Sequence, residues 1–213
     1  MVEVLVVVAV LTIIAAILLP ALAITKYKTS KLGCVTCLKQ IGLAYRIWAQ
    51  DNNDKYPMQV SVTNGGAMEL IATGNVAACF QVMSNQLSTP KILICPTDTN
   101  RIAATNFAIG FNNDNISYFV GLDADLNHPQ MFLSGDDNFA VGGVPVKSGL
   151  LQLSTHTPVA WTSLRHVAYD SHFWTPARGN ILFVDGSVQQ LTTKGLQQAL
   201  QQTGVATNRL AIP

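Results

Sequence analysis

The first 24 residues, MVEVLVVVAVLTIIAAILLPALAI, are almost entirely apolar and carry a single charge, Glu3. As a helix rising about 1.5 Å per residue, this segment is long enough for a hydrocarbon core of about 30 Å. A carboxylate inside such a segment costs roughly 2.5–3.5 kcal/mol on insertion scales, so it needs a partner. We therefore expect a helix that lies in a bilayer or against copies of itself, with a specific role for Glu3.

Two other interpretations of this segment fit its sequence less well. A secretory signal peptide has an apolar stretch of about 7–15 residues behind a basic region and a small-residue cleavage site. Here the apolar run is longer and nothing basic precedes it. An ordinary membrane anchor explains the length and the basic residues Lys26, Lys28 and Lys31 that follow, but it leaves Glu3 unexplained.

The composition limits the partners of the chain. It has 213 residues, a net charge of +1 and 12% charged residues, about half the usual charged share of soluble domains. This excludes a strongly basic nucleic-acid binder, and no nucleic-acid partner is predicted. Low charge suits a subunit that hides much of its surface against neighbours, and the rest of the chain is long enough for one domain.

The helical pattern continues beyond the apolar segment and becomes amphipathic. Apolar residues recur at three- and four-residue spacing: Cys34, Cys37, Leu38, Ile41, Tyr45 and Trp48. We expect a long helix over 1–53, with its membrane or filament-core part at 1–24, a kink or melted turn near Pro20, and a stop at Asp51–Asp54. Residues 54–213 are then a globular α+β head.

The N-terminal segment resembles that of mature type IV pilins and type II secretion pseudopilins. Glu3, the run VEVLVVVAVL and Pro20 carry the resemblance. The segment CVTCLKQIGLAYRIWAQDNNDKYP and the motifs ICPTD and NILFVDGSV are similar to pilin-like proteins of Verrucomicrobia and Planctomycetes, which often end in a His-x9-Asp-Gly segment. Two features depart from these patterns: Glu3 is third rather than fifth, and twelve residues rather than nine lie between His172 and Asp185-Gly186. We therefore expect a leader and two mature residues, including any N-methylated first residue, to precede Met1.

The resemblance implies a type IV pilin-like fold, in which the long helix packs on an antiparallel β-sheet head. It also implies that Glu3 pairs with the N-terminal ammonium of an adjacent subunit, because a buried charge pair favours one register over all others. The alternative for Glu3 is a membrane-interface position favoured by the helix N-terminus. The implied partners are copies of the chain, the inner membrane before assembly, and the pilus or secretion machinery.

Three functions remain open on the sequence. The first is a structural subunit of an extracellular type IV pilus-like filament. The second is a pseudopilin that forms the periplasmic piston of a type II secretion system. The third is a membrane-anchored binding or catalytic ectodomain. The sequence has no Ser-His-Asp order, phosphate loop or dinucleotide fingerprint in a suitable context, so an enzyme is not predicted.

In the head we expect helices at 77–87 and 194–202. Strands are predicted at 92–95, 117–121, 130–133, 150–153, 159–162, 180–184 and 187–191. Asp185-Gly186 joins the last two strands and is the pair preferred in a two-residue type I′ hairpin.

The four cysteines are candidates for disulfide bonds if the head lies outside the cytoplasm, where disulfides persist. Cys34 and Cys37 are poorly placed to bond to each other on a helix, and each could reach toward Cys79 or Cys95. The family resemblance favours Cys34–Cys95, because similar proteins pair a helix cysteine with one in a Cys-Pro-x-Asp segment. Cys37–Cys79 is the second expected pair, and zinc ligation or free buried thiols are the alternatives.

Two clusters are candidates for ligand chemistry. Asp123, Asp125 and Asn127 alternate like the start of a calcium loop, although the glycine and distant Glu of an EF-hand are missing; the alternative is a solvated turn. His166, Asp170 and His172 could form a metal or acid–base site, and the alternative is a surface or interface loop. No cofactor is predicted beyond the possible Ca²⁺.

Overall fold

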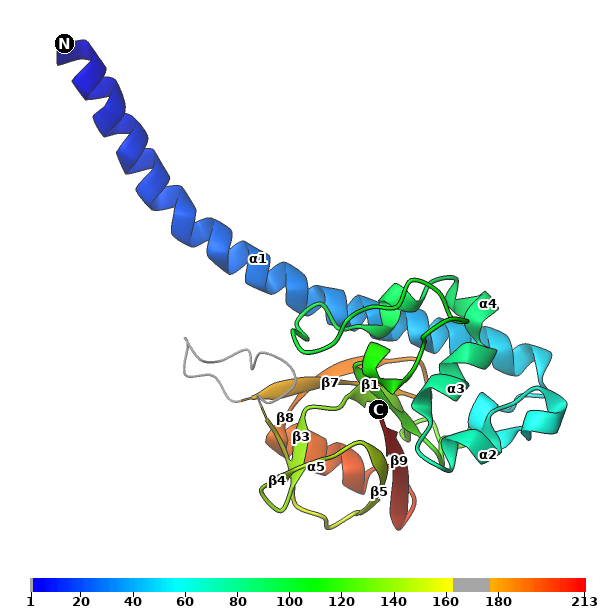
Figure 1. Ribbon diagram of the computed structural model, residues 1–213. Helices are drawn as coiled ribbons and strands as arrows, with labels where there is room; N and C mark the ends of the chain where they lie inside the picture. The colour runs from blue at the N-terminus through cyan, green and yellow to red at the C-terminus, as the bar shows by residue number, and fades with distance from the viewer. Residues whose placement is uncertain (1, 163–176) are drawn as a thin grey trace.

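The computed structural model describes residues 2–162 and 177–213 of the chain. Helix α1, Val2–Asp51, packs its second half on an antiparallel sheet, which gives an α+β fold. Figure 1 shows the first half of α1 extending away from the head, residues 54–213. The structure describes the side chains of α1 at residues 2–4, 6–18 and 32–51. The break predicted near Pro20 lies outside these ranges. We call residues 2–18 the stalk.

The second half of α1 is held on the head by apolar residues that recur every three or four positions. Leu38, Ile41 and Tyr45 are fully buried. Gly42 lies among them, and a Cβ there would come within 2.9 Å of Leu182 Cδ1. The glycine therefore allows the helix to approach the sheet more closely than a larger residue would.

The large sheet is antiparallel and has the strand order β5-β9-β1-β2-β7-β8. Its strands are β1 Tyr118–Gly121, β2 Phe132–Asp136, β5 Gly149–Ser154, β7 Arg178–Phe183, β8 Val188–Thr192 and β9 Thr207–Ile212. A second sheet has the order β4-β3-β6, with β3 Phe139–Val141, β4 Val144–Pro145 and β6 Val159–Trp161.

The large sheet separates two hydrophobic layers, because successive side chains of a strand point to opposite faces. Tyr118 and Val120 of β1 belong to the layer that contains the buried face of α1. Phe119, between them, belongs to the opposite layer with Leu196 and Leu200 of helix α5, Thr193–Gln201.

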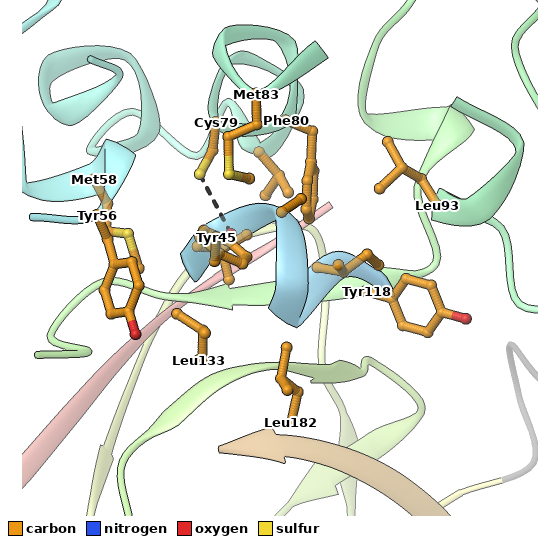
Figure 2. Packing of buried hydrophobic residues seen from close by; sticks show 14 of the residues in the cluster. Tyr45, Tyr56, Met58, Cys79, Phe80, Met83, Leu93, Tyr118, Leu133 and Leu182 are labelled. Carbon is orange, nitrogen blue, oxygen red and sulfur yellow. Dashed lines mark hydrogen bonds between the residues drawn. The ribbon is translucent and has the colours of Figure 1, made fainter. Parts of the chain in front are cut away.

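Short helices connect α1 to β1. They are η1 Pro57–Gln59, η2 Val62–Asn64, α2 Met68–Ile71, α3 Val76–Val82, α4 Ser84–Leu87, η3 Pro90–Leu93 and η4 Asn113–Asn115. Figure 2 shows Tyr45 of α1 packed among residues of this segment. The centroid of its ring lies 6.2 Å from that of Phe80 and 5.6 Å from that of Tyr56. The short helices thus cover α1 on the side away from the sheet.

Most predicted elements of the head are confirmed with small shifts at their ends: the strands at 117–121, 130–133, 150–153, 159–162, 180–184 and 187–191 and the helix at 194–202. The helix predicted at 77–87 is divided into α3 and α4. The strand predicted at 92–95 is wrong, because η3 lies there. Pro90 suits a first helical turn, and Thr89 Oγ1 accepts a hydrogen bond from Lys91 N–H at 3.4 Å, so local capping outweighs the apolar run.

The predicted hairpin between β7 and β8 is present, but its turn is not type I′. Gly186 has a φ of 84°, whereas Asp185 has no positive φ. Gly186 N–H donates to the Phe183 carbonyl at 3.0 Å, and Phe183 N–H donates to the Ser187 carbonyl at 2.9 Å. These bonds define a three-residue loop that ends in a left-handed glycine.

Residues 99–112 form an irregular loop that polar contacts fasten to the head. Arg101 Nη2 lies 2.9 Å from Asp137 Oδ2, and the side chain of Asp137 is fully buried. Arg101 also donates to the carbonyls of Ile116 and Pro213. One guanidinium thus ties this loop to the chain segments that precede β1 and follow β9.

Candidate assembly interface

The stalk exposes every large aliphatic side chain that is described in it. The exposed fractions range from 47% at Ile14 to 74% at Val2. Because consecutive residues are apolar, the exposed side chains surround the helix. A helix that is apolar all round is normally buried, and a patch of this size is typical of an interaction surface. The stalk therefore requires partners on every side.

Glu3 is exposed in the first turn of α1, within this apolar surface. The helix N-terminus favours a negative charge there by about 0.3–1 kcal/mol. Any partner that buries the stalk also desolvates this carboxylate. Such a partner must then supply a positive charge or hydrogen-bond donors to compensate.

The apolar surface continues on the outer face of the second half of α1. Leu32, Leu43 and Ile47 are 66%, 60% and 39% exposed. Their spacings of eleven and four residues place them on one side of a helix. These residues were not predicted from the sequence, because the prediction followed only the face that is buried. The same helical periodicity identifies them on the opposite face.

The disulfide Cys34–Cys95 is confirmed and joins the second half of α1 to the head, with 4.9 Å between the Cα atoms. Pro96 packs beside it, because a Cβ on Gly33 would lie 3.0 Å from Pro96 Cγ. The helix is therefore fixed to the head near the point where its packed half begins. A load applied to the stalk would reach the head through this covalent bond.

The second predicted pair, Cys37–Cys79, is wrong, since both cysteines are free thiols. Cys79 is buried and its sulfur lies 3.4 Å from the Tyr45 hydroxyl (Figure 2). Burial raises the pKa of Cys79 to about 12. Burial also raises the pKa of Cys37, whose thiol hydrogen-bonds to Tyr118 on β1. The two thiols therefore face different parts of the core.

The predicted calcium loop is organised by an arginine. Asp123 Oδ2 accepts the backbone N–H of Arg209 at 2.8 Å, and Asp123 Oδ1 lies 2.9 Å from Arg209 Nε. Asp125 Oδ1 accepts both the backbone N–H and the side-chain amide of Asn127 at 2.8 Å. Calcium at this loop would have to compete with Arg209 for Asp123, and the calcium site stays a prediction.

Two surface hollows lie beside the Asp123–Arg209 pair. The more polar one has a volume of about 380 Å³ and includes His128 and Gln152. The other, which we call the methionine pocket, has a volume of about 430 Å³. Its apolar lining consists of Met58, Met68, Ile71, Ala72 and Leu122.

The remaining predicted site residues, His166, Asp170 and His172, lie outside the described residues. Across 2–162 and 177–213, no group of three or more His, Cys, Asp or Glu side chains is arranged to hold a metal ion. No helix in the described part of the chain is long and apolar enough to cross a membrane.

Comparisons of the chain with known protein families, curated proteins and solved structures find no match. The geometry alone therefore defines the candidate interface. It consists of the exposed stalk, Glu3 and the outer face of α1 marked by Leu32, Leu43 and Ile47.

Proposed function

We propose that this chain is the structural subunit of a type IV pilus-like helical filament. In this proposal the stalks of many copies pack together as the core and the heads form the outer wall. The observation that carries it is the stalk, whose described large aliphatic side chains are all at least 47% exposed, whereas one face of the second half of the same helix is buried on the head.

A filament of copies supplies the partners that the stalk needs on every side. Burial of each large aliphatic side chain contributes about 1.5–3 kcal/mol, so several together offset the cost of ordering a subunit. A repeated head-to-tail contact between copies that does not close into a ring gives an open helical polymer. The same surface can therefore recruit any number of copies.

The second half of α1 supports the proposal in two ways. Leu43 and Ile47 extend the apolar surface toward the head, so contacts between copies need not end at the stalk. The Cys34–Cys95 bond fixes each head to its helix. We propose on these grounds that the α+β architecture is of the type IV pilin kind.

Glu3 gives the proposed core its register. We propose that its carboxylate pairs with the N-terminal ammonium of an adjacent subunit, so that only one axial stagger leaves no buried charge unpaired. Before assembly, the apolar segment would be held in the inner membrane by the same hydrophobic effect.

The test is a Glu3→Gln chain compared with wild type and with Asp114→Asn, which neutralises an exposed acid on the head. Filaments are counted by electron microscopy of material shed from cells that express each chain, and head stability is measured by urea denaturation. Glu3→Gln should abolish or disorder filaments while leaving the denaturation curve unchanged. Normal Glu3→Gln filaments would refute the register role, and a wild-type chain that stays monomeric would refute the filament.

A further inference from the structure

Three cysteines lie where α1 begins to pack on the head, and two of them are joined. Cys34 is bonded to Cys95, and Cys37 is a free thiol one helical turn further along α1. We propose that Cys37 is a transfer thiol, which bonds to Cys34 while this part of the chain is unfolded and then gives up that bond to Cys95. This route gives each subunit its disulfide and does not depend on whether copies assemble.

The first bond is favoured by the short loop that it closes. Cys34 and Cys37 are three positions apart, whereas Cys34 and Cys95 are 61 positions apart. In a flexible chain the probability that two residues meet falls with about the 3/2 power of their separation, which favours the short loop by roughly tenfold to a hundredfold. A small disulfide oxidant such as oxidised glutathione therefore joins Cys34 to Cys37 first, and is itself reduced to two thiols.

The folded helix works against this first bond. Residues three positions apart on a helix have Cβ atoms about 5–6 Å apart, whereas a disulfide needs Cβ atoms about 3.5–4.5 Å apart. Both cysteines lie in the half of α1 that packs on the head. Formation of this part of the helix therefore disfavours the Cys34–Cys37 bond and drives its transfer to Cys95.

Thr97 is placed to assist the attack by Cys95. Its hydroxyl oxygen lies 3.0 Å from Cys95 Sγ and 3.5 Å from Cys34 Sγ. Because the sulfur atoms of a disulfide carry no proton, the hydroxyl is the donor in these contacts. In the reduced chain the same hydroxyl can donate to Cys95 and stabilise its thiolate, which is the form that attacks a disulfide.

The transfer conserves electrons and protons. The Cys95 thiolate attacks Cys34 Sγ, the bond between Cys34 and Cys37 breaks, and its electron pair leaves on the sulfur of Cys37. The proton that Cys95 gave to solvent is matched by one that Cys37 takes up. Burial raises the pKa of Cys37, whose thiol hydrogen-bonds to Tyr118. Cys37 therefore stays protonated in the folded chain and does not attack the new bond.

The test follows the disulfides of the full-length chain as it folds. The reduced chain is unfolded in urea and diluted into detergent micelles with oxidised glutathione, and free thiols are blocked with N-ethylmaleimide at successive times. Lys31 and Lys39 flank both helix cysteines, so the tryptic peptide 32–39 is two hydrogens lighter when it holds the first bond. The final bond joins peptide 32–39 to peptide 92–101. Mass spectrometry measures both species.

The internally bonded peptide 32–39 should appear first and should decay as the joined peptides form. In Cys37→Ala the Cys34–Cys95 bond should form roughly tenfold more slowly, because oxidation must then close the long loop directly. Cys79→Ala is the matched control, since it removes the other free thiol, and it should form the bond at about the wild-type rate. Thr97→Val should prolong the internally bonded peptide severalfold, and Thr97→Ser should restore the wild-type course.

The outcomes decide the role of Cys37 separately from the filament. If the joined peptides form before the internally bonded peptide, or equally fast in Cys37→Ala, the transfer is overturned. Faster formation in Cys37→Ala would identify the Cys34–Cys37 bond as a dead end and would also overturn it. The wild-type time course needs no substitution, so it decides the order of the two bonds even if a variant fails to fold. None of these results depends on whether filaments form.

Discussion

Cys34 of α1 and Cys95, which follows η3, are separated by 61 residues and joined by a disulfide. All of the short helices except η4 lie between them. The bond therefore closes a covalent loop around the part of the head that covers α1. It also links the packed half of the helix to the segment that leads into the irregular loop at 99–112.

Removal of this bond should lower the stability of the head. For a loop of this length, the chain-entropy model gives a loss of about 4 kcal/mol in the free energy of unfolding. We expect a Cys34→Ala/Cys95→Ala chain to unfold at a correspondingly lower urea concentration than wild type. Cys37→Ala, which removes an unbonded thiol of the same helix, is the control. Equal midpoints for the double variant and wild type would contradict the structural role of the bond.

The buried thiol of Cys79 should make the head sensitive to alkali. Its pKa is about 12 in the folded chain against an ordinary value of 9.0. Below about pH 9 the thiol is protonated in both the folded and the unfolded chain. Its contribution to the free energy of unfolding therefore does not change with pH in that range. Between pH 9 and pH 12 only the unfolded chain releases the proton, so the free energy of unfolding falls, by up to about 1.4 kcal/mol per pH unit.

Urea denaturation of wild type and Cys79→Ala at pH 7, 9 and 10 measures this effect. The alanine variant should be less stable at pH 7, because it loses packing and leaves the Tyr45 hydroxyl without this contact. Its stability should then fall less steeply above pH 9 than that of wild type. If the free energies of unfolding of the two chains fall in parallel from pH 7 to pH 10, Cys79 does not titrate as the structure implies.

The ion pair of Arg101 and Asp137 should contribute more to the stability of the head than the ion pair of Arg209 and Asp123. The first has side chains 11% and 0% exposed, and the second has side chains 61% and 23% exposed. Arg101→Met removes the ion pair of a fully buried carboxylate and should cost about 3–5 kcal/mol. Arg209→Ala should cost about 1 kcal/mol or less.

Chemical denaturation of the two variants checks this order. Addition of Asp137→Asn to Arg101→Met should recover part of the loss, because it removes the buried charge that Arg101 balances in the wild-type chain. Equal costs for the two arginine variants would contradict the view that the irregular loop is fastened by a buried charge pair.

The outer face of α1 should affect assembly without affecting folding. Leu43→Ser and Ile47→Ser replace exposed residues, so the free energy of unfolding should change by about 0.5 kcal/mol or less. If each side chain is buried between copies, the concentration needed for assembly should rise roughly tenfold or more. Sedimentation of assembled material over a concentration series measures this shift. Gln40→Ser, an exposed polar change on the same helix, should leave it unchanged.

The elements that could be predicted from the sequence are those whose buried apolar residues form a regular local pattern. The packed half of α1 was predicted because its apolar residues recur every three or four positions, which is also how they are buried. The strands around Tyr118 and Leu182 were predicted because each is a run of apolar residues between turn signals.

Features that depend on contacts between residues far apart in the chain could not be predicted from the sequence. Strand β9, Thr207–Ile212, was not predicted, although it lies between β5 and β1 in the sheet. The Cys37–Cys79 pairing failed because α3 packs at Tyr45, eight residues and about 12 Å along the helix from Cys37. The methionine pocket joins residues from the segment after α1 to Leu122 and Arg209, so no local pattern could indicate it.

The most direct measurement of the central claim is electron cryo-microscopy of the assembly purified from cells that express the full chain. The proposed function predicts a filament with a core of packed α1 helices, heads on the outside, and Glu3 of each copy facing a positive group of a neighbour. An isolated monomer, or an assembly in which the stalk side chains contact no other copy, would contradict it.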